Sequence, residues 1–119
     1  MQIEVSNGEI VDKYTILLIK AERIQDEDKL KNVQKELDSL KIPMSLIPVR
    51  LTDFRKLKAV NEKLWTVEEK IRRCDKELTF NVKFINLARR VYKLNDERAE
   101  IKKHINTYTG SSLVEEKSY

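Results

Sequence analysis

The sequence predicts an all-α fold, a bundle of about four helices, and three observations lead to this prediction. Only two glycines and two prolines occur among 119 residues, so few positions interrupt a helix. Charged residues make up 37% of the chain and hydrophobic residues 40%, a mixture typical of long helices or coiled coils. The hydrophobic residues recur at intervals of three and four, which places them on one face of a helix. By its length the chain is expected to form a single domain, residues 1–119.

The first helix is expected over residues 8–25. Ser6 and Glu9 have capping-box spacing, in which the hydroxyl accepts from the Glu9 amide and the carboxylate reaches back to the Ser6 amide. Hydrophobic residues then follow at helical spacing: Ile10, Tyr14, Leu17, Ala21 and Ile24. The alternating residues 1–5 before this helix fit either an extended lead-in or a short strand.

A break is predicted at Asp26, where the hydrophobic pattern loses phase. Asp26 is a good N-cap, and acidic residues follow it in the first turn, so the second helix is expected over residues 27–41. Residues 42–51 contain two prolines, each of which disfavours helical geometry in the residue before it. We therefore expect a non-helical connection there, with a short strand paired to residues 2–5 as the alternative.

The last two helices are expected to be the longest, over residues 53–77 and 82–108, with Thr52 or Asp53 as the N-cap of the first of them. One unbroken seam comprises Leu57, Val60, Leu64, Val67, Ile71, Cys74 and Leu78. The other seam comprises Phe84, Leu87, Val91, Leu94, Arg98, Ile101, Ile105 and Tyr108. Such three-four spacing is typical of coiled-coil packing. Because the link is short, these helices should form a long antiparallel hairpin against which the first two pack.

The end of the chain and its cellular location follow from simpler signals. Gly110 suits the C-terminal cap of the last helix, and the polar tail 111–119 either docks or frays. Cys74 is the only cysteine, which fits a reducing compartment. The sequence shows no signal peptide and no hydrophobic stretch long enough to span a membrane. We expect a cytoplasmic protein without membrane contact.

Arg98 is the irregular member of its seam, because it lies between Leu94 and Ile101. A buried guanidinium is costly unless a carboxylate satisfies it. In a structural interpretation, Arg98 extends to solvent or pairs with an acid such as Glu22 or Glu68 and sets the helix register. In a functional interpretation, it lines a pocket for an anionic ligand.

Other polar residues are expected to share the neighbourhood of Arg98. They are Asp12, Lys13, Asn61, Trp65, Glu68, Arg72, Asn95 and Lys102. If their side chains converge, they form a polar pocket with one aromatic wall; otherwise they form surface pairs such as Glu68–Arg72. The candidate ligand-binding residues are Arg98, Arg72, Glu68, Trp65, Asn95 and Lys102.

No catalytic or metal-binding pattern is evident. His104 is the only histidine, and Cys74 lies in a seam, as expected for an inert packed thiol. The sequence therefore predicts no metal site and no cofactor. The last helix carries a row of basic residues that is compatible with nucleic-acid binding: Arg89, Arg90, Lys93, Lys102 and Lys103. Three acidic residues, Asp96, Glu97 and Glu100, interrupt this row.

Several stretches resemble a family of small bacterial and phage proteins known only as a domain of unknown function. They include residues 8–13, 61–65 and 115–119, so the resemblance covers nearly the whole chain and implies a docked tail, but it implies no activity. A weaker resemblance links Asp12, Leu17-Leu18 and Glu22-Arg23 to the first helix of helical chorismate mutases. Those enzymes form intertwined dimers that bind a dicarboxylate, but their other helix signatures are absent here.

Three functional hypotheses follow. The leading one is a non-enzymatic helical interaction or assembly module that acts as a homodimer, with an interface at Leu57, Leu64, Trp65 and Ile71. The second is a binder of, or an enzyme acting on, a small anionic ligand such as a nucleotide or carboxylate near Arg98. The third is nucleic-acid binding through the helix at residues 82–108.

Overall fold

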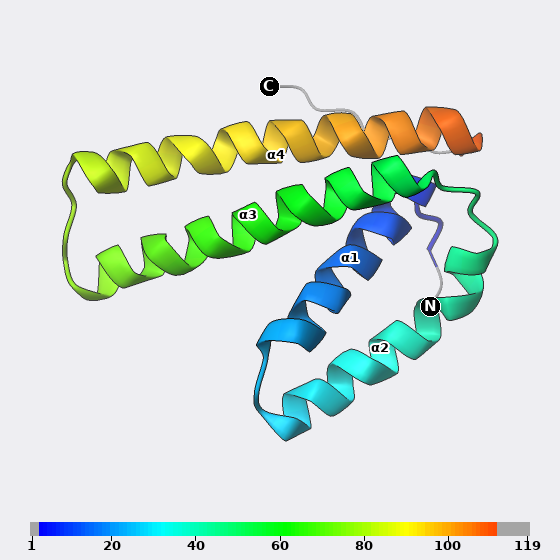
Figure 1. The fold of residues 1–119 in the computed structure, drawn as a ribbon, viewed down its shortest axis with the longest axis horizontal. Coiled ribbons are helices and arrows are strands. Elements are labelled where there is room, and N and C mark those ends of the chain that lie inside the picture. Colours follow the sequence, from blue (N-terminus) through cyan, green and yellow to red (C-terminus); the bar gives the residue numbers. More distant parts are fainter. Residues whose placement is uncertain (1–2, 112–119) are drawn as a thin grey trace.

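The computed structural model describes residues 3–111, and within this range it contains four helices and no strand. They are α1 (Asn7–Arg23), α2 (Glu27–Ser45), α3 (Leu51–Lys76) and α4 (Val82–Thr109). The predicted all-α class and the antiparallel hairpin, formed by α3 and α4, are confirmed (Figure 1). In the described range α1 contacts all three other helices, whereas α2 contacts α1 alone. No described helix is long and apolar enough to cross a membrane.

The start of α1 confirms the predicted N-cap, because the Ser6 hydroxyl accepts from the Glu9 amide at 3.2 Å. The helix ends at Arg23, two residues before the predicted end, because Ile24 has extended geometry. The alternative of an N-terminal strand is wrong for residues 3–6, whose proposed partner segment is helical up to Ser45. Residues 1 and 2 lie outside the described range.

The helix α2 begins as predicted, with the Asp26 carboxylate accepting from the Lys29 amide at 3.0 Å. Its predicted end is wrong, since the helix continues through Pro43 to Ser45. Pro43 lies in the last turn, where its missing N–H deprives only one carbonyl of a helical partner. The Ser45 hydroxyl also donates to the Ile42 carbonyl at 2.6 Å, which supports this last turn.

The helix α3 starts earlier than predicted, at Leu51, and neither Thr52 nor Asp53 is its N-cap. Arg50 occupies that position without a side-chain hydrogen bond to the helix. The preceding Ile47 is buried in the core, so the chain is anchored there before it turns into the helix. Asp53 is consequently buried inside the first turn.

The C-terminus of α3 closes with a Schellman motif. The Thr79 amide donates to the Cys74 carbonyl at 2.8 Å and the Leu78 amide to the Asp75 carbonyl at 3.1 Å. This geometry places Leu78 in the left-handed region, with φ of 54°. The prediction that Leu78 belongs to the buried seam is wrong, because it lies beyond the end of the helix and its side chain is 77% exposed.

The helix α4 has a side-chain cap at its N-terminus and a left-handed glycine cap at its C-terminus. The Asn81 side chain accepts from the Phe84 amide at 3.3 Å. Gly110 has φ of 70°, which confirms it as the C-cap. The tail beyond Ser111, for which the sequence allows either docking or fraying, lies outside the described residues.

Two hydrophobic clusters hold the described helices together. The larger joins the hairpin to α1 and to the connection before α3: Val11, Ile47, Leu57, Val60, Leu64, Val67, Leu94 and Ile105. The smaller lies between α1 and α2: Leu17, Val33 and Leu37. The regular seam of α3 is thus largely buried within this chain.

Candidate functional site around Arg98

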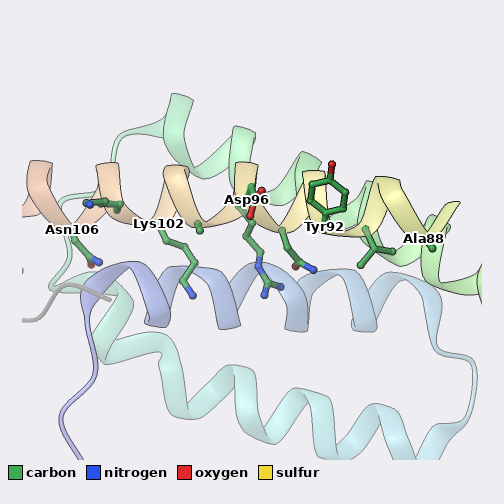
Figure 2. A pocket seen from close by; sticks show the side chains of 10 residues that line it. Ala88, Tyr92, Asp96, Lys102 and Asn106 are labelled. Carbon is green, nitrogen blue, oxygen red and sulfur yellow. The ribbon is translucent and has the colours of Figure 1, made fainter. Parts of the chain in front are cut away.

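The helices α1 and α4 cross at an unusually short distance at Gly8. A Cβ atom at this position would lie 2.6 Å from the Lys102 carbonyl oxygen, so only glycine fits. The Gly8 amide donates to Asn106 Oδ1 at 2.6 Å. Figure 2 shows Lys102 and Asn106 pointing from α4 toward α1. Arg98 lies four residues before Lys102, so this crossing also positions the turn of α4 that carries Arg98.

An ion pair reinforces the crossing. Lys102 Nζ lies 2.7 Å from the Glu9 carboxylate, and the lysine side chain is almost completely buried. The second half of the predicted capping box is therefore wrong: within the described residues, Glu9 pairs with Lys102 and makes no hydrogen bond to the Ser6 amide. The opposite charge on α4 attracts this carboxylate more strongly than a neutral amide does.

A buried polar network links α1 to α3 beside the crossing. Asn61 Nδ2 donates to Asp12 Oδ1 and to Thr15 Oγ1, both at 2.9 Å. The Thr15 hydroxyl donates to the Asp12 carbonyl at 2.7 Å. All three residues are buried, so these bonds satisfy polar groups that water does not reach.

A cleft of about 320 Å³ opens next to this network, between α1, α3 and α4. Its polar lining includes Asn61, Trp65, Glu68, Arg72 and Arg98. Five of the nine residues expected in the neighbourhood of Arg98, itself included, therefore line one cleft, and Trp65 is the aromatic one. Lys13 lies elsewhere, 3.7 Å from the Glu36 carboxylate of α2.

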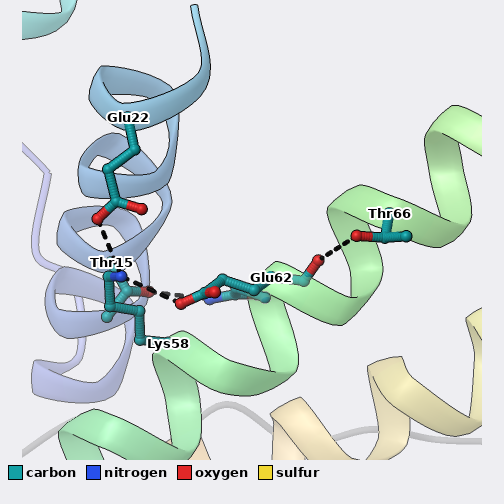
Figure 3. Close-up of polar contacts among 6 residues, drawn as sticks. Thr15, Glu22, Lys58, Glu62 and Thr66 are labelled. Atoms are coloured by element: carbon teal, nitrogen blue, oxygen red, sulfur yellow. Dashed lines mark hydrogen bonds and ion pairs between the residues drawn. The ribbon is translucent and has the colours of Figure 1, made fainter.

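Arg98 is half-buried, and its guanidinium makes no ion pair or hydrogen bond with any residue between 3 and 111. Of the two acids considered as partners, Glu22 pairs with Lys58 at 3.0 Å (Figure 3). The other, Glu68, lines the same cleft without forming an ion pair with Arg98. An arginine that is partly desolvated and lacks a carboxylate in the described chain has donors available for a ligand.

Lys58 connects α1 to α3 at the edge of this region. Its ammonium lies 3.0 Å from Glu22 and 3.0 Å from Glu62, as the dashed lines in Figure 3 show. The hydrogen bond to Glu22, followed by that to Glu62, raises the pKa of Lys58 above its ordinary value. Both acids are thus paired with Lys58.

Arg98 also faces a second hollow, a groove of about 710 Å³ whose described lining residues all come from α4 (Figure 2). Asn95 and Lys102 lie in this groove and not in the cleft. The six predicted ligand-binding residues are therefore divided. Arg72, Glu68 and Trp65 share the cleft with Arg98, whereas Asn95 and Lys102 share the groove with it.

The predicted interface residues are placed mainly inside the chain. Leu57 and Leu64 are buried in the larger core, and Ile71 packs against it. Trp65 is half-buried, with the Arg23 guanidinium 5.9 Å from its ring centroid. A surface for a second copy must therefore involve other residues.

The basic row of α4 is also divided. Arg89, Arg90 and Lys93 are exposed, whereas Lys102 is paired with Glu9. Arg90 lines a groove of about 630 Å³ together with basic residues of α1 and α3: Arg23, Lys63 and Lys70.

Residues 3–111 contain no group of three histidine, cysteine, aspartate or glutamate side chains able to hold a metal ion. Cys74 is buried. His104 lies 3.6 Å from the buried Asp53, a pair that sequence reasoning missed because 51 positions separate the two residues. It also missed Asn106, although the isolated Gly8 was a signal that two helices approach closely there.

The chain belongs to a family of proteins, because it matches the model of the Family of unknown function (DUF6165) over residues 1–119. This match confirms the expected membership of an uncharacterised family that spans the whole chain. No curated protein and no solved structure matches the chain. The family description assigns no activity.

Proposed function

We propose that the chain is a non-enzymatic helical interaction module that binds its partner through the far end of the α3–α4 hairpin. This hairpin tip comprises Leu78, Phe80, Val82 and Ile85, whose side chains are 77%, 55%, 71% and 54% exposed. Figure 1 shows that this end extends beyond α1 and α2. Exposed apolar side chains gathered at one place are typical of a protein-binding surface.

Leu78 is the observation that carries this proposal. Its φ of 54° lies in the left-handed region, where a leucine costs about 1–2 kcal/mol and glycine costs little. The side chain is largely exposed, so packing within the described chain returns little of this cost. The Schellman motif accounts for the backbone geometry but not for a leucine in place of glycine, and contact of this side chain with a partner would account for the leucine.

The charge around the hairpin tip indicates the chemistry of that partner. Residues 70–93 contain eight basic and two acidic residues, a net charge of 8 − 2 = +6, which exceeds the +4 of the whole chain. Complementary charge speeds association and selects against other partners. We therefore propose an acidic, amphipathic protein segment, whose apolar face covers the tip and whose carboxylates meet the surrounding basic residues.

A homodimer is the competing occupant of this surface. A two-fold interface at the tip would bring two segments of charge +6 together, and like charges across an interface cost several kcal/mol. This repulsion favours an acidic partner over a second copy. Nucleic acid is a further competitor because of the basic groove. The exposed leucine, valine and isoleucine side chains, however, have no hydrogen-bond donors for phosphate oxygens.

Fluorescence anisotropy with labelled peptides tests the proposal. The probe is an acidic amphipathic helix with leucines on one face, and its matched control replaces those leucines by serine. Binding to the first peptide alone is expected. The variant Leu78→Ser with Val82→Ser should raise the Kd at least about tenfold, because burial of one such side chain contributes about 1.5–3 kcal/mol.

The protein control is Ile42→Ser with Leu46→Ser, two side chains that are 74% and 76% exposed but lie at the end of α2. This variant should bind the peptide with unchanged affinity. Equal binding of both peptides, or equal loss in both variants, would contradict the proposal. A dimer that sedimentation detects and Leu78→Ser dissociates would make a second copy the occupant, and preferential binding of a DNA duplex would support the nucleic-acid hypothesis instead.

A further inference from the structure

The cleft that contains Arg98 is separate from the hairpin tip and has the composition of a small-ligand site. Its volume of about 320 Å³ lies at the lower end of the roughly 300–1,000 Å³ that small-molecule pockets occupy. We propose that this cleft binds a small carboxylic acid with an apolar body, a binding activity beyond partner binding, although its Arg72 also belongs to the basic segment 70–93.

Two arginines line the cleft, the half-buried Arg98 and the exposed Arg72, and we assign the ligand's anionic group to them. Arg98 approaches from α4 and Arg72 from α3, and neither forms an ion pair or hydrogen bond with the described residues. Arginine binds carboxylate through two parallel hydrogen bonds, a geometry that gives both affinity and orientation. Because Arg98 is half-buried, its bond to an anion is less screened by water than one at the surface.

Much of the rest of the lining is apolar. Ile16 and Ile19 of α1 and Leu64 of α3 line it, and the last two are buried. The Trp65 ring supplies an aromatic wall, and its indole N–H donates to the Glu69 carboxylate on the next turn of α3. That bond orients the ring and satisfies one oxygen of Glu69, whose carboxylate keeps its charge.

Glu68 is the second acid of the lining, and no described residue pairs with it. A carboxylate beside two arginines favours a ligand that carries an ammonium group next to its carboxylate. An amino acid with an apolar side chain therefore fits better than a simple acid of the same shape. Both share the carboxylate and the apolar body, and the experiment separates them.

The fluorescence of Trp65 reports directly on the cleft, since it is the only tryptophan of the chain. We would titrate the protein with 3-phenylpropanoate, L-phenylalanine, phenethylamine and inorganic phosphate. The first two should change the emission with saturation, and L-phenylalanine should bind more tightly. Phenethylamine lacks the carboxylate and phosphate lacks the apolar body, so neither should saturate at the same concentrations.

The variant Arg98→Met should raise the Kd for 3-phenylpropanoate at least about tenfold, since charge-assisted hydrogen bonds contribute about 1.5–3 kcal/mol. Its Tm should be unchanged or higher, because an unpaired and partly buried charge is replaced by an apolar side chain. The control Arg89→Met removes an exposed arginine of the same helix that is not in the lining of this cleft, and it should bind like the wild type.

Several results would overturn the inference. One is the absence of saturable binding of either carboxylate at millimolar concentration. Another is equally tight binding of phenethylamine or phosphate, and a third is an unchanged Kd in Arg98→Met. Weaker binding of L-phenylalanine than of 3-phenylpropanoate would overturn the role of Glu68. The variant Leu78→Ser, made for the hairpin tip, should leave these titrations unaltered, so the two proposals fail separately.

Discussion

Replacement of Gly8 by alanine tests the crossing of α1 and α4 that positions Arg98. The new Cβ would lie 2.6 Å from the Lys102 carbonyl oxygen and 3.0 Å from Asn106 Oδ1. The first of these is a backbone atom, so a change of side-chain rotamer cannot relieve the contact. The helices must therefore separate by several tenths of an ångström, which also strains the Gly8–Asn106 hydrogen bond.

The expected cost follows from three contributions. Overpacking costs typically about 1–3 kcal/mol. Loss of the buried hydrogen bond adds about 0.5–1.5 kcal/mol. Alanine returns about 0.5–1 kcal/mol, because it loses less conformational entropy than glycine in a helix. The net loss is about 2 kcal/mol, equivalent to a Tm lower by about 8 °C in a chain of 119 residues.

The assay is thermal and urea unfolding followed by circular dichroism, with Gly110→Ala as the control. A Cβ at Gly110 meets nothing within 4 Å, so only its φ of 70° opposes alanine, at about 1 kcal/mol. Asn106→Ala and the double variant complete a mutant cycle. Removal of the Asn106 side chain should rescue little, because the Lys102 carbonyl remains in place.

The reasoning would be refuted by a Gly8→Ala protein as stable as the wild type. Full rescue in the double variant would show that the side-chain contact, and not the backbone contact with Lys102, determines the spacing of the helices.

Three further predictions concern single side chains. Leu78→Gly should raise the free energy of unfolding by about 1 kcal/mol in urea titrations, because it removes left-handed strain at an exposed position. Asn61→Leu should lower it by about 3 kcal/mol, since the buried Asp12 carboxylate loses a hydrogen-bond donor. Lys58 contributes stability that is fully present below its ordinary pKa of 10.5 and is lost as the pH rises through its raised folded pKa. Lys58→Met should therefore lose less stability than the wild type when the pH is raised past this value.

Each of these has a matched control. Leu78→Ala keeps the left-handed strain and should not gain the stability of the glycine variant. Asn32→Leu and Lys63→Met change exposed residues without a hydrogen bond or ion pair in the described chain, and both should unfold like the wild type. A control that changes as much as its partner variant would contradict the corresponding explanation.

The helices could be predicted from the sequence because local interactions specify them. Ser6, Asp26 and Gly110 act as caps where the sequence placed them, and each cap involves neighbours within a few residues. The errors also have local causes. The sequence predicts that α2 ends before Pro43, but a proline in the final turn removes only one backbone hydrogen bond, so the helix continues. Leu78 has the spacing of the α3 seam, but the helix ends at Lys76, before this residue.

The candidate site was partly predictable for a different reason. An arginine at a seam position marks Arg98 in the sequence itself, and helical spacing places Trp65, Glu68 and Arg72 within a few turns of α3. Periodicity does not determine the axial register of α4 against α3. For this reason the separation of Asn95 and Lys102 from the cleft could not be predicted.

The sequence by itself determined which segments are helical, where most of them are capped and that one seam contains a charge. Only the tertiary structure decided that this charge has no partner among residues 3–111 and that it faces a cleft. The reason is the range of the interactions: caps and seams join residues a few positions apart. The Gly8–Asn106 contact, which sets the crossing of α1 and α4, joins residues 98 positions apart, and it forms only when the whole chain has packed.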